Sequence, residues 1–457
     1  MARSLRTSAL ALAAAAFLGV FAWETTVSTQ IVRARDPGAR GGVSAGDPIA
    51  GLTSYEAEYF TAGQEDFNET ETVDEGLGPR MNLDSCVGCH SQPASGGSSP
   101  AVNPQIAFAA GGLASEPALP FLSIDGPVRE ARFVRNPDGT PDGGVHALFT
   151  IAGRSGADGC TLTVGDFARQ YANHNVIFRI PTPVFGAGLI EQIPDSAILS
   201  ARSANGAAKS ALGIRGRPNF HLAGRAISGQ TNSNGNDGTI ARFGWKAQNK
   251  SLLLFAGEAY NVEMGITNEL FLTEREEQSA CQFAEHPNSI TDASATTGVG
   301  TLSSIEKFAF FMRFLAPPTP ATDSFGGAKS IASGRALFTS VGCAYCHTPS
   351  MQTGNSRIVA LKNQTANLFS DLLIHDMGIG LADGVSQGEA GPREFRTAPL
   401  WGVGQRLFFL HDGRTSDLLA AIRAHASVGS EANGVVTTFQ GLSETKKQDL
   451  INFLRSL

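Results

Sequence analysis

The sequence predicts a mainly α-helical protein built from two domains that share one pattern. An apolar pattern of helical spacing at 60–67 recurs at 331–338, with a phenylalanine or isoleucine, a glycine three residues later and a phenylalanine four residues after that. Each copy precedes a Cys-x-x-Cys-His unit. Between the copies, the proline-rich segment 317–325 cannot continue a helix and marks a boundary.

The Cys-x-x-Cys-His unit is typical of covalent haem attachment. Its two thiols add to the haem vinyl groups, and the adjacent histidine becomes the proximal iron ligand. One isolated copy could be a zinc or redox pair, but two copies that both end in histidine favour haem. We therefore expect two covalently bound c-type haems, with iron held at Cys86, Cys89 and His90 and at Cys343, Cys346 and His347.

These units define the expected domains. Residues 51–316 form an N-terminal haem domain, and its long Gly-, Asn-, Ser- and Asp-rich stretches, such as 226–238, indicate surface loops. Residues 326–457 have the size of a cytochrome c and end on an amphipathic helix with Ser443 as its N-cap. The expected fold class is thus two cytochrome c-type haem domains, with long loop-rich insertions in the first.

The first thirty residues have the pattern of a targeting segment. Arg3 and Arg6 precede an apolar, alanine-rich stretch at 7–23, as in a secretory signal peptide. This stretch is at the short limit for spanning a bilayer, so an uncleaved N-terminal anchor is the alternative. Either way we expect export to the periplasm. Residues 31–50, rich in Gly, Arg, Asp and Pro, are expected to be a flexible lead-in.

Composition limits the binding partners that we expect and the roles that the cysteines can have. The net charge is −7 at pH 7 and no long basic run is present, which argues against a nucleic-acid partner. Membrane contact is expected only through the possible anchor. Four of the six cysteines belong to the haem units. The other two, Cys160 and Cys281, suggest a disulfide in an oxidising compartment, with two unrelated buried thiols as the alternative.

Five segments together resemble the di-haem oxidoreductase family, also labelled peroxidase or thiol oxidoreductase. They are 83–90, 213–219, 242–247, 375–378 and 395–402. The family is similar to the bacterial di-haem cytochrome c peroxidases, the methylamine-dehydrogenase maturase and the rubber oxygenases. The resemblance covers roughly residues 50 to 457 and is specific for the family but not for a substrate.

The resemblance implies a second ligand for the C-terminal haem. In the peroxidases that ligand follows a Tyr/Phe-His-x-Gly segment and a short helix, which match 409–413 and 418–425 here. His425 therefore becomes the expected partner of His347, with Met377 and His375 as alternatives. Two imidazoles should give a lower potential than imidazole with methionine.

The resemblance also implies two helpers for the N-terminal haem. Trp245 matches a tryptophan that lies between the haems of the peroxidases, which makes it the candidate electron relay; a core tryptophan is the alternative. Glu263 matches their distal carboxylate and could act as acid and base in peroxide cleavage. The alternative is a solvated helix glutamate, with Glu191 and Glu258 as fallback candidates.

Two departures from the peroxidase pattern concern the N-terminal half. Ile180 stands where the relatives have a calcium-binding asparagine, which puts that calcium in doubt. His174 is a weak match to their removable distal histidine, and without it the N-terminal haem would be five-coordinate.

The expected function is a periplasmic, peroxidase-like di-haem oxidoreductase. Peroxide or another small oxidant would react at the N-terminal haem, and electrons from a small redox donor protein would pass through the C-terminal one. A di-haem oxygenase or maturase acting on an organic or protein substrate, and a pure electron carrier, are the alternatives. The long insertions count against the pure carrier.

Overall fold

The computed structural model describes residues 33–41, 45–111, 119–151, 159–220, 240–274, 279–281 and 287–457. The predicted signal peptide or anchor at 1–30 and the predicted loop at 226–238 lie outside the described residues. In the described ranges, no helix is both long enough and apolar enough to cross a membrane.

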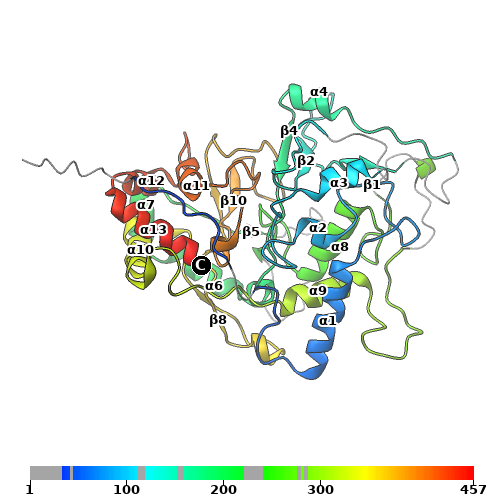
Figure 1. The fold of residues 1–457 in the computed structure, drawn as a ribbon, viewed down its shortest axis with the longest axis horizontal. Helices are drawn as coiled ribbons and strands as arrows, with labels where there is room; N and C mark the ends of the chain where they lie inside the picture. Colours follow the sequence, from blue (N-terminus) through cyan, green and yellow to red (C-terminus); the bar gives the residue numbers. More distant parts are fainter. Residues whose placement is uncertain are drawn as a thin grey trace, which may run out of the picture. The chain divides into compact units, whose positions relative to one another are not determined.

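Among the described residues helices outweigh strands, as the sequence predicted, with thirteen α-helices and five short two-stranded antiparallel sheets (Figure 1). The helices are α1 (Ser54–Asn68), α2 (Cys86–Cys89), α3 (Pro104–Ala110), α4 (Phe167–Ala172), α5 (Ala187–Glu191), α6 (Asp195–Ser203), α7 (Gly206–Leu212), α8 (Leu252–Met264), α9 (Ser304–Phe314), α10 (Gly327–Val341), α11 (Leu418–Ala424), α12 (Asn433–Gln440) and α13 (Glu444–Ser456). The strands are β1 (Arg80–Met81), β2 (Glu130–Phe133), β3 (Phe149–Thr150), β4 (Val176–Arg179), β5 (Asn219–Phe220), β6 (Ile240–Ala241), β7 (Met351–Gln352), β8 (Thr365–Ala366), β9 (Ile374–Asp376) and β10 (Glu394–Arg396).

In the N-terminal half, α1 and α9 cross closely, and α8 packs on α9 (Figure 1). Both crossing helices begin with a capping box, at Thr53 and Ser303, which satisfies their first free amide groups. The crossing point is Gly63, where an added Cβ would collide with the carbonyl oxygen of Lys307. Phe67 packs beside it, with its ring 4.8 Å from that of Phe311.

The C-terminal half repeats this arrangement with α10 and α13, coloured yellow and red in Figure 1. Gly334 is the crossing point, because a Cβ there would collide with the carbonyl oxygen of Asp449. Phe338 packs against Phe453 with ring centroids 5.5 Å apart. The pattern noted at 60–67 and 331–338 therefore marks the same helix crossing in both halves.

Two short sheets bring distant residues to the cavities described below. β2 pairs with β4 in a register that sets Glu130 opposite Arg179. β9 pairs with β10 and sets His375 opposite Phe395. Residues opposite each other in a sheet lie side by side, so each register brings its two side chains together at one cavity.

Residues 34–41 of the expected flexible lead-in are held against the C-terminal helix. The main-chain amide of Ala34 donates to Glu444, and the carboxylate of Asp36 accepts from Leu418 and pairs with Arg455 at 2.7 Å. Arg40 donates to the carbonyl of Leu457. The composition of this segment indicated mobility, but these long-range partners fix it in place.

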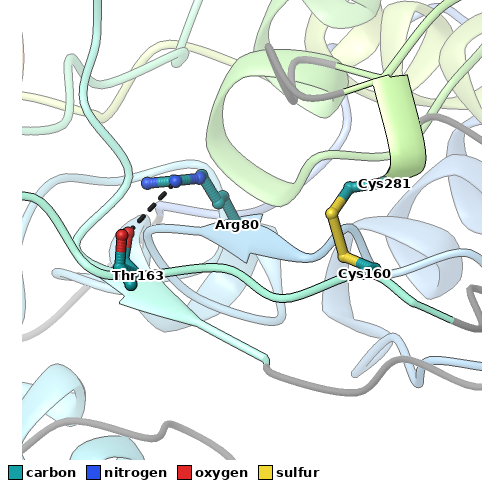
Figure 2. Close-up of a disulfide and its surroundings, with 4 residues drawn as sticks. All are labelled: Arg80, Cys160, Thr163 and Cys281. Atoms are coloured by element: carbon teal, nitrogen blue, oxygen red, sulfur yellow. Dashed lines mark hydrogen bonds between the residues drawn. A yellow bond between two sulfur atoms is a disulfide. The ribbon is translucent and has the colours of Figure 1, made fainter.

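The predicted disulfide is confirmed: Cys160 and Cys281 are joined, with their Cα atoms 4.9 Å apart (Figure 2). Both cysteines are buried beside Leu162. Figure 2 also shows Arg80 of β1 donating to the carbonyl of Thr163, which anchors the segment that carries Cys160. The bond ties together segments 121 residues apart in the sequence.

Replacing both cysteines by serine should lower the free energy of unfolding by about 2–4 kcal/mol, because a long unfolded-state loop is released. Thermal unfolding followed by circular dichroism measures this. Wild type in reductant should approach the melting temperature of the double variant. Equal melting temperatures of oxidised wild type and variant would contradict a stabilising role for this bond.

Candidate functional site

The first Cys-x-x-Cys-His unit opens onto a cavity with an empty volume of about 1230 Å³. Ser85 caps the short helix α2 by accepting from the amide of Gly88, which presents both cysteines of the unit to the cavity. Much of the remaining lining comes from α8, α9, β2, β4 and the segment after β4, with further residues from α1, α3 and the segment 244–248. Its apolar members include Phe67, Leu83, Val184, Phe308 and Met312.

A main-chain hydrogen bond orients the histidine of this unit. His90 Nδ1 lies 2.9 Å from the carbonyl oxygen of Gly97. A carbonyl can only accept, so Nδ1 carries the hydrogen and Nε2 keeps its lone pair. Burial lowers the pKa of His90 to about 4, which keeps the ring neutral. These are the properties of an iron-binding imidazole.

The second unit opens onto another cavity, with an empty volume of about 1410 Å³. Its histidine is fixed in the same way, with Nδ1 of His347 3.0 Å from the carbonyl oxygen of Phe369. The aromatic ring of Phe338 lies beside it, at 6.3 Å, as Phe67 lies beside His90 at 6.0 Å. The two attachment sites therefore share one local geometry.

Of the three candidates for a second ligand here, His425 has the geometry of a ligand. It lines the second cavity, and its Nδ1 donates to the carbonyl of Ala421 at 2.7 Å, which again leaves Nε2 free. His347 lines the same cavity, and burial, followed by the charge of His425, lowers the pKa of His347 to about 4. Met377 also lines this cavity.

His375 is committed to other partners. Its Nε2 lies 3.0 Å from Asp371 and its Nδ1 lies 2.7 Å from Glu431. Both of its ring nitrogens are therefore directed at carboxylate oxygens. A doubly hydrogen-bonded imidazolium has no lone pair to give to iron.

A pair of carboxyl groups lies on the first cavity. Glu263, on α8, is hydrogen-bonded to Glu130, on β2, and accepts a hydrogen bond from Asn82 at 2.8 Å. Burial and then the charge of Glu130 raise the pKa of Glu263 well above its usual value. Burial opposes ionisation of Glu130 as well, but Arg132, 2.9 Å away, and the Glu263 hydrogen bond hold its pKa at about 2. The pair thus shares one proton at neutral pH.

Tyr260, one helical turn before Glu263, forms a second buried hydrogen bond to a carboxyl group. Its hydroxyl donates to Glu71 at 2.5 Å, and Tyr260 lines the first cavity. Burial raises the pKa of Glu71 to about 7, in spite of the Tyr260 hydrogen bond.

Trp245 lines both cavities. Its indole Nε1 donates to the carbonyl of Ile180 at 2.9 Å, and the amide of Ile180 donates to the carbonyl of His411. The imidazole of His411 lies edge-on to the indole, 6.4 Å away, and stacks on Phe395 at 4.4 Å. These rings form a continuous aromatic path from the first cavity to the second.

A buried ion cluster holds this path in place. Lys246, the residue after Trp245, pairs with Asp383 at 3.2 Å and lies 4.0 Å above the ring of Phe395. Arg179 of β4 pairs with the same carboxylate. One carboxylate from the C-terminal half thus binds two cations from the N-terminal half.

The remaining candidates lie in different surroundings. His174 is exposed, in the turn after α4, and does not line the first cavity. Glu191 is buried but accepts from the amide of Leu252 and pairs with Arg313, which is a structural role. Glu258 does line the first cavity, with Asn249 as a hydrogen-bond donor.

Sequence reasoning missed Glu130, Arg132, Asn82 and Tyr260. Glu130 and Arg132 lie two residues apart in a short strand, so both point to the same face. That spacing was the available signal, but nothing in the sequence connects β2 with α8.

The model of the family described as "Di-haem oxidoreductase, putative peroxidase" matches residues 165–457, which is more than half of the chain. The chain belongs to the di-haem oxidoreductase family. The match includes the second attachment unit, Trp245, Glu263 and His425, whereas the first unit lies upstream of it. No curated protein matches the chain.

Two solved structures show weaker resemblance. Hydrazine synthase of Kuenenia stuttgartiensis, in a structure pressurized with xenon, is 12% identical over 92% of this chain and 97% of its own, with a TM-score of 0.37. A MauG-like protein associated with microbial copper homeostasis is 18% identical over 34% of this chain and 52% of its own, with a TM-score of 0.24. Both TM-scores are below 0.5, so neither likeness bears on the function.

The di-haem family implies haem, and the residues present fit it. Each cavity presents two free thiols and an imidazole whose Nε2 is available. Each is otherwise mostly apolar and large enough for a macrocycle.

Replacing Glu71 by glutamine should remove one contribution to the pH dependence of stability. The folded-state pKa of about 7 lies above the unfolded value of about 4.3, so the folded protein binds more protons between these pH values and loses stability as pH rises through them. The variant should therefore gain stability relative to wild type from pH 4.5 to pH 7, in melting temperatures.

The control is Asp138→Asn. Hydrogen bonds from Thr140 lower the pKa of Asp138, so this variant should not show the gain. A constant difference between Glu71→Gln and wild type across this pH range would contradict the assignment.

Proposed function

We propose that the protein is an exported, periplasmic, peroxidase-like enzyme built from two cytochrome c-type haem domains, with loop-rich insertions in the first. The c-type haem attached at Cys86, Cys89 and His90 is the reaction site. Cys343, Cys346, His347 and His425 would hold the second haem, which would supply electron relay. The observation that carries this proposal is the unlike lining of the two cavities: a proton-sharing carboxyl pair in the first, and a second oriented imidazole in the second.

The haem iron supplies the electron transfer to peroxide, and the protein supplies the proton movements. Cleaving the O–O bond of peroxide requires that one oxygen lose its proton and that the other, which leaves as water, gain one. The ionised member of the Glu130–Glu263 pair can take the first proton, and the protonated member can give the second, so that water leaves. Arg132 keeps one member ionised, which keeps the pair in the working state at neutral pH.

Trp245 is the proposed electron relay between the two sites. Its indole borders both cavities, and its hydrogen bond to Ile180 fixes the ring. A large delocalised ring can hold an oxidising equivalent for a short time. Electrons would enter at the C-terminal haem from a small redox donor protein.

Stopped-flow mixing with hydrogen peroxide, with oxygen as the control oxidant, tests this function. Reaction with peroxide alone supports the peroxidase. Reaction with oxygen would favour the oxygenase, and no reaction with either would favour the pure electron carrier.

Replacing Glu263 by glutamine should slow the peroxide reaction by about 10²- to 10⁴-fold, because the amide cannot exchange the shared proton. The rate constant for the spectral change after peroxide mixing measures this. Glu258→Gln is the control, since Glu258 lines the same cavity outside the pair. Equal rates for Glu263→Gln and wild type would remove Glu263 from the mechanism.

Replacing His425 by alanine should convert the C-terminal haem from low spin to high spin, because it removes the second strong ligand. The electronic spectrum of the oxidised protein reports this. Met377→Ala, which alters the same cavity, should leave the spin state unchanged. The opposite result would assign the ligand to Met377.

A further inference from the structure

Two arginines on the second cavity lack the carboxylate partner that most other buried arginines have among the described residues. Arg396 ends β10 and Arg406 follows it by ten residues; their exposed fractions are 8% and 7%. In the described part of the chain, neither forms an ion pair with a carboxylate. Nε of Arg396 donates to the carbonyl of Gly244, and Nε and Nη2 of Arg406 have no hydrogen-bond partner.

The contrast with other buried arginines is direct. Arg179, Arg242, Arg313 and Arg455 are equally buried, and each pairs with a carboxylate: Asp383, Asp195, Glu191 and Asp36 respectively. Burying a guanidinium without an anion is strongly unfavourable. Burial lowers the pKa of Arg396 to about 10, and the charge of Arg406 adds to this lowering. Two such groups therefore lie near each other here. Two neighbouring buried cations with no protein anion point to a ligand anion.

The position of the pair indicates where that anion comes from. Both arginines line the second cavity, with His347 and His425, and neither lines the first. Both also border a smaller cavity, of about 580 Å³, whose lining includes Trp245. A ligand that fills the second cavity and carries carboxylates on one edge would reach both arginines.

We propose that Arg396 and Arg406 form a carboxylate-binding site for the propionates of the C-terminal haem. The cysteines attach at the vinyl-bearing side of a haem, and its two propionates leave from the opposite side. Two guanidinium groups match two carboxylates in number and charge, and a guanidinium can bind a carboxylate through two hydrogen bonds. This inference rests on haem occupying the second cavity, as proposed above, and does not depend on what reacts at the first.

Arg396→Met and Arg406→Met test the site in the haem-loaded protein. Methionine has a similar length and fits an apolar setting. If no anion is bound, removing an unpaired buried charge should raise the melting temperature. If the propionates are bound, each variant should have a lower melting temperature, and the reduction equilibrium constant of the C-terminal haem should fall at least tenfold, or about 59 mV for one electron. Loss of a nearby positive charge disfavours the more negative, reduced state.

The controls distinguish the effect of this site on the potential from the effect of removing any positive charge. Arg393→Met removes a charge from the same half of the protein, but Arg393 is partly exposed and paired with Asp376, so the potential should change by less than tenfold. Arg396→Lys and Arg406→Lys keep the charge and should retain most of the wild-type potential. Haem content, measured as the pyridine haemochrome, should remain two per chain.

The other possible results of these experiments either support or overturn binding of the propionates. Methionine variants that keep two haems and the wild-type potential, with an unchanged or raised melting temperature, would overturn it. If they lose haem, the lysine variants must restore it; a failure to do so would also overturn the proposal. Acetate added to wild type at constant ionic strength should leave the potential unchanged, because the site is already filled; an acetate-dependent potential would instead assign the site to a free anion. If the protein does not react with peroxide, its melting temperature, haem content and reduction potential still test this site.

Discussion

The redox sites depend on one interaction that occurs three times, the hydrogen bond from an imidazole Nδ1 to a main-chain carbonyl. His90 uses the carbonyl of Gly97, His347 that of Phe369, and His425 that of Ala421. Each bond fixes the ring and its tautomer and leaves the lone pair of Nε2 free, as an iron-binding imidazole requires. His375, bound by two carboxylates, shows what an imidazole becomes without this arrangement: a structural cation.

Around these rings, one framework carries two different linings. In both halves a helix crossing at a glycine, Gly63 or Gly334, holds a phenylalanine beside the motif histidine. The framework does not determine what faces that histidine from the other side of the cavity. In the first half, the elements β2 and α8 bring two carboxyl groups together; in the second half, α11 ends at an imidazole. The unlike roles proposed for the two haems rest on these additions and on Trp245, which borders both cavities.

The sequence predicts the features that local pattern or covalent chemistry determines. The Cys-x-x-Cys-His units, the repeated helix and the leftover cysteine pair are of this kind, and the structure shows the helix crossing in both halves and the disulfide in place. The pairing of Glu130 with Glu263, the anchoring of Asp36 by Arg455 and the nearness of Arg396 to Arg406 could not be predicted, because each depends on chain segments brought together only by the fold. Trp245 is intermediate: the family resemblance pointed to it, and its position on both cavities agrees with a relay.

The central claim is that the two haems differ in ligation, one open and one held by two imidazoles. Quantitative electron paramagnetic resonance of the fully oxidised protein tests it most directly. The account predicts one high-spin and one low-spin haem in equal amounts per chain. Two low-spin haems that remain low-spin on reduction would contradict it, because the first site could then bind no oxidant.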